Sequence, residues 1–245
     1  MSPLQDMIDA SRRIVFFGGA GVSTESGIPD FRSADGLYMA GGPIPPEVIL
    51  SRSFFEAHPR EFFEFHRQNV LHPEARPNAA HRKLAELERA GRLAAVVTQN
   101  IDGLHQTAGS VNVIELHGSA HRNQCALCGR QHPMEVVYRA EGIPRCDCGG
   151  VIEPAVVLYE DPLDRNVIAA AVKAITGADM LIIGGTSLVV YPAAGLVDYF
   201  EGDRLVVINK GGPVGAGDLA GRALMISQPI GEVLAEIEVR PVGGA

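Results

Sequence analysis

Short apolar runs that alternate with helix-like stretches are the feature that most limits how this chain can fold. The runs predict buried strands at Arg13–Phe17, Ala94–Thr98, Val113–Leu116, Met180–Ile183 and Leu205–Ile208. Helical patterns occupy Ala79–Ala90, Asp164–Thr176, Ala193–Tyr199 and Ile230–Ile237. Strands that alternate with helices favour a parallel sheet covered on both faces, with ligands beyond the carboxyl ends of the strands. The predicted fold class is therefore α/β, with a Rossmann-like doubly wound parallel sheet.

The loop after the first apolar run is rich in glycine. Residues 18–33 read GGAGVSTESGIPDFRS, and close-packed glycines bring backbone N–H groups near a bound phosphate. Thr24 stands where a dinucleotide fingerprint has its third glycine, and Pro29 keeps Ile28 extended. The segment therefore predicts a phosphate-cradling loop that continues into a lid with Phe31 and Arg32. This combination suits a dinucleotide whose own bond is broken; the alternative is a simple tight turn.

A second polar segment, Gln99–His105, follows the second predicted strand. Gln99, Asn100 and Asp102 supply amides and a carboxylate that can both donate to and accept from a carboxamide. The alternative is an Asx-rich turn in which Asp102 caps a short helix.

His117 and Gly118 follow the third predicted strand. A histidine at a strand end, with an ordinary pKa near 6.5, suits a general base; a structural histidine is the alternative. Gly184–Ser187 after the fourth strand predicts a second anion or ribose loop at a helix N-terminus. Asn209 stands where Rossmann-type sites keep a ribose-binding side chain.

The four cysteines form two close pairs, Cys125 with Cys128 and Cys146 with Cys148. Two such pairs predict one structural zinc ion held by four thiolates, with no open position for chemistry. Glycines at 129, 149 and 150 suit the tight turns of a zinc knuckle. The alternatives are four buried thiols or a redox pair. The second pair encloses one residue rather than two, so its chelate is tighter.

Two insertions interrupt the strand and helix pattern and predict a smaller lobe within a single domain spanning 1–245. The helical insertion covers about 39–77, with a core helix at Pro59–Leu71, and the zinc-binding insertion covers about 119–153. The large lobe then comprises about 1–38, 78–118 and 154–245. Residues 240–245 predict a frayed tail.

Composition narrows the function classes. A net charge of −8 and a pI near 5.5 argue against nucleic-acid binding. No apolar run approaches the ~18 residues of a membrane-spanning helix, and the first residues, MSPLQDMIDASRR, carry no apolar signal core. The expected location is cytoplasmic, where four cysteines indicate metal binding before disulfides.

Taken together, these motifs resemble the sirtuins, the NAD-dependent protein lysine deacylases. The matching pieces are GAGVSTESGIPDFRS, TQNIDGLH, the His-Gly pair at 117–118, the four-cysteine insertion, GTSLVVYPAA and VVINK, in family order over about 220 residues. The chain looks most like the compact bacterial members. The resemblance implies NAD as a consumed co-substrate, one structural zinc per chain and acylated lysine in proteins or peptides as substrate.

The resemblance also implies a role for each site residue. His117 would be the catalytic base, and Gln99 and Asn100 would position the nicotinamide ribose and a water. Val157, Leu158 and Tyr159 would pair with the substrate backbone. The NAD-binding residues would be Gly19, Ala20, Gly21, Thr24, Phe31, Arg32, Gln99, Asn100, Ile101, Asp102, His117, Gly185, Thr186, Ser187, Asn209 and Lys210. The zinc ligands would be Cys125, Cys128, Cys146 and Cys148.

The implied reaction transfers the acyl group to ADP-ribose. The acyl oxygen attacks the anomeric carbon of the nicotinamide ribose, and nicotinamide leaves to give an alkylimidate. His117 deprotonates the ribose hydroxyls so that the 2′-hydroxyl attacks the imidate carbon, and water completes the release of free lysine and 2′-O-acyl-ADP-ribose. Two alternatives share the cofactor loop: an NAD-dependent protein ADP-ribosyltransferase, which does not need His117 as base, and an NAD-sensing binding module.

Two departures from the family pattern bear on the substrate. Relatives that accept acidic acyl groups use a Tyr-x-x-Arg pair, and here the aligned positions hold His66 and Asn69, with Arg67 nearby. Acetyl-lysine is therefore the expected substrate and succinyl-lysine a poor one. The peptide-binding stretch reads Tyr159-Glu160-Asp161, where many relatives have Phe-Gly-Glu.

Overall fold

The computed structural model describes residues 2–33, 35–39, 43–211 and 221–240. Residues 241–245 of the predicted tail, 212–220 of the predicted large lobe and 40–42 of the predicted helical insertion lie outside the described residues. Among those described, the main sheet has six strands in the order β3-β2-β1-β7-β8-β9. The strands are β1 (Ile14–Gly18), β2 (Leu93–Thr98), β3 (Val113–Glu115), β7 (Met180–Gly184), β8 (Arg204–Ile208) and β9 (Ala223–Ile226).

The strand order identifies the fold class. All neighbouring pairs in the main sheet are parallel, and renumbering the strands along the chain gives 3-2-1-4-5-6, the Rossmann order. The predicted α/β class with a doubly wound parallel sheet is confirmed. The order reverses between β1 and β7, so the crevice where such sheets bind ligands lies beyond the ends of these two strands.

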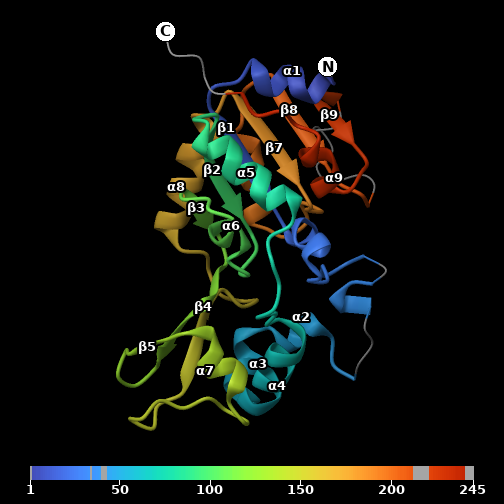
Figure 1. The fold of residues 1–245 in the computed structure, drawn as a ribbon. Helices are drawn as coiled ribbons and strands as arrows, with labels where there is room; N and C mark the ends of the chain where they lie inside the picture. The colour runs from blue at the N-terminus through green and yellow to red at the C-terminus, as the bar shows by residue number, and fades with distance from the viewer. Residues whose placement is uncertain (1, 34, 40–42, 212–220, 241–245) are drawn as a thin grey trace.

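Successive residues of the buried strands point to opposite faces of the sheet, and each face is covered (Figure 1). Phe16 lies in a hydrophobic cluster with α1 (Pro3–Asp9), α5 (Ala79–Arg89) and α9 (Ile230–Ala235). Phe17 lies in a second cluster, with α8 (Arg165–Thr176) and the 3₁₀ helix η4 (Ala193–Tyr199). Burial on both faces explains why these strands read as continuous apolar runs.

Side-chain caps fix where the two longest covering helices begin. Asn78 accepts hydrogen bonds from Ala80 N and His81 N, and the His81 ring accepts from Asn78 N in return. Asp164 caps α8 through Asn166 N and Val167 N. Such caps satisfy backbone donors that have no partner inside the helix.

The two insertions pack together in the lower part of Figure 1. Among the described residues, an antiparallel sheet of order β5-β4-β6 joins four α-helices and one 3₁₀ helix around one hydrophobic cluster that includes Phe55, Phe62, Phe63, Val137 and Ile152. Its elements are η3 (Leu37–Met39), α2 (Pro46–Ile49), α3 (Arg52–Ala57), α4 (Pro59–Asn69), β4 (Gly118–Cys125), β5 (Gln131–His132), α7 (Met134–Arg139) and β6 (Ile152–Val156).

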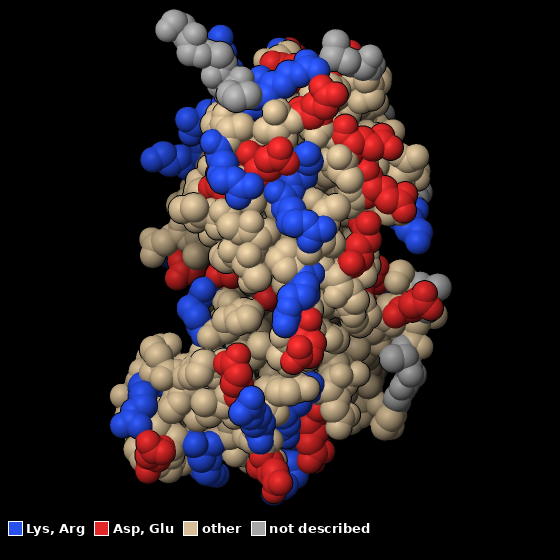
Figure 2. Space-filling model, in the orientation of Figure 1, with Lys and Arg blue, Asp and Glu red and all other residues tan. Residues whose placement is uncertain are grey.

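The outer surface carries both signs of charge. Figure 2 shows Lys and Arg interspersed with Asp and Glu over the face it presents, without a continuous basic patch. No helix within the described ranges is long and apolar enough to cross a membrane.

Candidate active site

The loops after β1 and β7 pack backbone against backbone at the switch point. Gly21 N donates to Gly185 O at 2.8 Å, and Gly19 N donates to Gly184 O at 3.2 Å. A Cβ on Gly21 would lie 2.8 Å from Gly185 Cα, and one on Gly185, whose φ is +59°, would lie 2.3 Å from Val22 N. Glycine is therefore required on both loops. Short 3₁₀ turns follow the first loop, η1 (Ala20–Val22) and η2 (Thr24–Ser26).

A buried serine joins the first loop to the segment after β2. Ser23 Oγ donates to Asp102 Oδ2 at 2.6 Å and accepts from Asn100 Nδ2 at 3.1 Å. The other Asp102 oxygen accepts from Leu104 N, the first residue of α6 (Leu104–Thr107), in an Asx turn whose N-cap residue is Gly103. The Asx turn that the alternative predicted is therefore present, but Asp102 is not the cap residue of α6, and its second oxygen accepts from Ser23. Ser23 was absent from the predicted site; it lies in the glycine loop, but its partner is 79 residues away.

Gln99 and His117 form the next part of the site. Gln99 Nε2 donates to Thr186 Oγ1 at 3.1 Å, which links the loops after β2 and β7. His117 Nδ1 lies 2.9 Å from Gln99 O. A carbonyl oxygen only accepts, so Nδ1 carries the proton and Nε2 has the free lone pair. Burial lowers the pKa of His117, and the hydrogen bond to Gln99 O opposes this.

Position 118 must be glycine because the chain crosses closely over β6. Gly118 has φ +76°, and a Cβ there would lie 2.1 Å from Ala155 O. His117 stands immediately before β4, between the main sheet and the small lobe. The next segment of the site begins with Val157, whose N donates to His117 O at 2.9 Å.

The segment Val157–Tyr159, which was predicted to pair with the substrate and is named the substrate segment for that prediction, is anchored to the small lobe. Tyr159 N donates to Leu50 O and Tyr159 O accepts from Arg52 N, both at 3.0 Å. Leu158 N donates to Asp161 Oδ2. Asp161 also binds the Arg52 guanidinium through both oxygens, at 3.0 and 2.8 Å. These bonds hold the segment extended beside His117.

The aromatic and cationic residues of the lid gather around Tyr38. The Phe31 and Tyr38 rings meet edge to face with centroids 5.6 Å apart, and Arg32 Cζ lies 5.3 Å from the centre of the Tyr38 ring. The Tyr38 hydroxyl hydrogen-bonds the hydroxyl of Tyr159. Tyr38 was also absent from the predicted site, because only the fold brings it to Tyr159. Ile101 borders the same hydrophobic cluster as Phe31.

The other predicted site residues make fewer contacts with the rest of the site. The Gly184–Ser187 loop precedes η4, which begins at Ala193 as predicted, and residues 188–192 separate the loop from the helix. Thr24 Oγ1 turns back to Gly21 O. Asn209 and Lys210 follow β8, one strand beyond β7, and no described hydrogen bond joins their side chains to the rest of the site.

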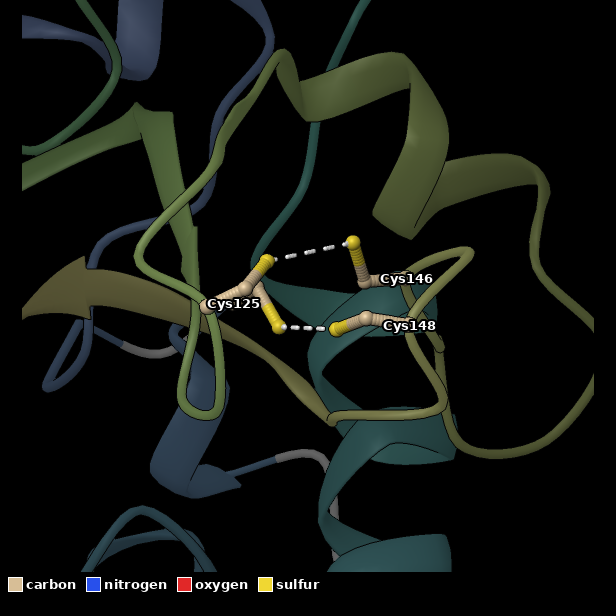
Figure 3. Close-up of side chains that lie close together, drawn as sticks. Cys125, Cys146 and Cys148 are labelled. Carbon is tan, nitrogen blue, oxygen red and sulfur yellow. Dashed lines mark hydrogen bonds between the residues drawn. The ribbon is translucent and has the colours of Figure 1, made fainter.

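The sulfur atoms of the four cysteines face one another in the small lobe, and Figure 3 shows the labelled Cys146 and Cys148 pointing toward Cys125. Their sulfur atoms all lie within 4.8 Å of one another, with Cys125 Sγ 3.4 Å from Cys148 Sγ and Cys128 Sγ 3.7 Å from Cys146 Sγ. A zinc tetrahedron with Zn–S bonds of about 2.3 Å has edges of about 3.8 Å, so the set fits zinc. No disulfide is present among the four.

The surrounding backbone also suits metal-bound thiolates. Hydrogen bonds from the N–H groups of Cys128 and then Leu127 lower the pKa of the Cys125 thiol. A Cβ on Gly150 would lie 2.6 Å from Cys125 Sγ, so glycine is needed there. The single-residue spacing of the second cysteine pair does not keep its sulfurs out of the cluster.

The fold and site define a dinucleotide-binding α/β protein with a four-cysteine small lobe. The chain belongs to the Sir2 family, whose family model matches residues 19–192. This confirms the resemblance found in the motifs.

Similar proteins match over most of the chain. An NAD-dependent protein deacetylase of Clostridium acetobutylicum is 55% identical over 238 residues, which cover 96% of each chain. One from Cutibacterium acnes is 58% identical and covers 84% of this chain and 86% of its own. Among solved structures, a complex of Sir2, p53 peptide and NAD⁺ has a TM-score of 0.82 and 37% identity, and covers 96% of this chain and 95% of that one.

Proposed function

We propose that this chain is an NAD-dependent protein lysine deacetylase. The observation that carries the proposal is the pair formed by His117 and Gln99: the carbonyl fixes the proton on Nδ1, so Nε2 keeps a free lone pair and can act as a neutral base. The base stands directly beside the substrate segment, since Val157 N donates to His117 O. Relatives named as NAD-dependent protein deacetylases share more than half of their residues with it.

The cofactor would lie across the switch point. The backbone N–H groups of the glycine loop and the Arg32 guanidinium would face its phosphates. The Ser23–Asp102–Asn100 network would receive the nicotinamide carboxamide, because it offers carboxylate, hydroxyl and amide within one set of hydrogen bonds. The remaining proposed contacts are those of Gly19, Ala20, Gly21, Thr24, Phe31, Ile101, Gly185, Thr186, Ser187, Asn209 and Lys210.

NAD supplies the electrophilic ribose carbon and leaves as nicotinamide and acyl-ADP-ribose. The residues of this chain position the reactants and exclude water. His117 Nε2 takes the proton of a ribose hydroxyl, Gln99 O holds the ring, and Asn100 and Gln99 orient the ribose. Val157, Leu158 and Tyr159 pair with the backbone of the acylated peptide.

The four cysteines Cys125, Cys128, Cys146 and Cys148 would hold one zinc ion. Four protein ligands leave no open position, so the ion stabilises the small lobe and takes no part in the reaction. The free cysteines also agree with the cytoplasmic location that we infer.

The preferred acyl group is neutral. Burial, with a smaller effect of Arg67, lowers the pKa of His66 to about 4, so the ring is uncharged at neutral pH. Arg67 Nη1 donates to Gly142 O, and Asn69 Nδ2 donates to Phe65 O. No residue at the aligned positions supplies a free cation, so an acyl carboxylate would lose its hydration without a partner.

Nicotinamide release measured with and without an acetyl-lysine peptide tests the function. A deacetylase releases nicotinamide and free lysine in equal amounts, and only with the peptide. Transfer of ADP-ribose to protein without lysine release would instead support the ADP-ribosyltransferase alternative, and NAD binding without turnover would support a sensor. Comparing kcat/KM for acetyl, butyryl and succinyl peptides tests the acyl preference, which fails if succinyl equals acetyl.

A further inference from the structure

Two tyrosines connect the lid to the substrate segment. Tyr38 lies on η3, at the end of the lid, and Tyr159 ends the substrate segment 121 residues later; their hydroxyls hydrogen-bond each other. Both side chains are partly buried. They share the wall of an open cavity of about 440 Å³ with Arg32, Ser51 and Glu160.

On the lid side, Tyr38 contacts the two residues proposed to meet NAD. Its ring packs against Phe31 and under the Arg32 guanidinium. Its backbone N donates to Phe31 O at 2.9 Å. The position of the Tyr38 ring therefore depends on how Phe31 and Arg32 are held.

On the substrate side, Tyr159 has its backbone fixed and its side chain directed at the lid. Leu50 O and Arg52 N hold its N–H and carbonyl. Among the hydrogen bonds of the described residues, the bond between the two hydroxyls is the one that joins the substrate segment to the lid.

We propose that the Tyr38–Tyr159 hydrogen bond couples NAD binding to acyl-peptide binding. NAD contacts would order Phe31, Arg32 and hence Tyr38, and the peptide would order the substrate segment that carries Tyr159. A ligand that immobilises one tyrosine lowers the cost of ordering the other, so each ligand strengthens binding of the other by the same factor. This inference rests on the proposed function, and it assigns both tyrosines as positioning residues.

The test measures that factor with an unreactive pair of ligands. ADP-ribose lacks nicotinamide and does not react with an acetyl-lysine peptide. Calorimetry gives the Kd of the peptide without and with saturating ADP-ribose, and the reverse titration must return the same ratio. The variants are Tyr38→Phe, Tyr159→Phe and the double variant, each removing only a hydroxyl. Tyr138→Phe is the matched control, because Tyr138 lies on α7 in the same lobe and is 42% exposed.

We expect each ligand to tighten binding of the other in the wild-type protein and in Tyr138→Phe. Either site variant should reduce the factor about threefold to tenfold, the equivalent of one neutral hydrogen bond. The double variant should lose no more than a single one, because both remove the same bond. Thermal melting checks that the variants fold. If Tyr38→Phe does not fold, Tyr159→Phe alone is enough to test the coupling, because it removes the same hydrogen bond.

Two results would overturn the coupling and leave the proposed function intact: a wild-type ratio of one, or an unchanged ratio in the folded Tyr159→Phe protein. Failure of the wild-type protein to bind ADP-ribose or the peptide would overturn both.

Discussion

His117 depends on one carbonyl for its chemical state. Gln99 O fixes the proton on Nδ1, and the same glutamine reaches Thr186 through its side chain. The tautomer of the proposed base is therefore set by the backbone that follows β2, and the hydrogen bond that orients its ring comes from a carbonyl and not from a carboxylate. Because burial lowers the pKa of His117, the ring stays neutral at physiological pH.

Replacing His117 with alanine should reduce kcat/KM for an acetyl-lysine peptide about 10²- to 10⁴-fold, the usual contribution of a general base. ADP-ribose affinity should stay near the wild-type value. The exposed histidine at 58 offers a matched control, His58→Ala, which should keep full activity. Retention of more than about a tenth of wild-type turnover in His117→Ala would contradict the role as base.

The pH profile gives a second residue-scale prediction. A base with a lowered pKa loses activity only when the pH falls through that lowered value, so the acid limb of kcat/KM should have its midpoint below the ordinary 6.5. The rate should be flat from there to pH 8. Steady-state kinetics between pH 5 and 8 check this, and a midpoint above 7 would assign the limb to another group.

Ser23 is buried and holds two site residues at once. Ser23→Ala would leave Asp102 Oδ2 and Asn100 Nδ2 each without this partner, and an unsatisfied buried polar group costs about 1–3 kcal/mol. We expect a lower Tm and a raised KM for NAD, measured by thermal melting and nicotinamide release. Ser33→Ala, on the exposed part of the lid, serves as control. Equal effects of the two variants would argue against the network.

At the scale of elements, the zinc site holds β4 and β6 together with the cysteine turns. Protein purified without chelator should contain one zinc ion per chain by elemental analysis. Removing it should expose the amides of β4, β6 and α7 to hydrogen exchange, because metal binding and local folding are coupled. The strands of the main sheet should stay protected. An absence of zinc, or small-lobe amides that remain protected after chelation, would contradict the prediction.

The elements that the sequence predicted are those whose burial leaves a pattern. Strands β1, β2, β7 and β8 are apolar runs because the centre of the main sheet is covered on both faces, whereas β3 is a partly buried edge strand that begins with two apolar residues. By contrast, β4 reads Gly-Ser-Ala-His-Arg-Asn-Gln-Cys and has no apolar run, and β9 is a short edge strand that is only partly buried. Helices of four to six residues, such as α2, α6 and α7, are too short for periodicity to show.

The site residues also divide into those that the sequence could place and those that it could not. Residues that directly follow a strand, such as Gln99 and His117, could be placed because the carboxyl ends of parallel strands share one edge. Ser23 and Tyr38 could not, because their importance arises from partners 79 and 121 residues away. The helical stretch Ala193–Tyr199 was placed at the bounds of η4, but the sequence pattern did not show that residues 188–192 separate this helix from the Gly184–Ser187 loop.

At the scale of the whole molecule, buried histidines occur in both lobes. His66 stacks on Phe62 in the small lobe, and His81 meets His105 edge to face beneath the main sheet. Among the described residues, neither ring nitrogen of His66 or His105 has a hydrogen-bond partner. Burial lowers the pKa of His66 and His81 to about 4 and that of His105 to about 3.

These shifts predict how the free energy of unfolding depends on pH. The folded-state pKa values lie below the unfolded value of about 6.5, so between these values the unfolded chain binds protons that the native protein does not. Stability should be full above pH 6.5 and decline as the pH falls toward 4, by at most about 1.4 kcal/mol per pH unit for each histidine. Protonation of His81 also breaks the helix cap, because its Nδ1 accepts from Asn78 N.

Urea unfolding between pH 5 and 7 measures how steeply the free energy of unfolding depends on pH. Carboxyl groups of ordinary pKa are mostly ionised in this pH range, so they contribute little to the slope. His66→Leu removes one titrating ring and should lower the slope by up to one proton relative to the wild-type protein. His66 lies in the small lobe and His105 lies under the main sheet. If His66→Leu by itself removes the loss of stability at low pH, that loss originates in the small lobe. A slope that His66→Leu leaves at the wild-type value would show that this histidine is not held neutral by burial.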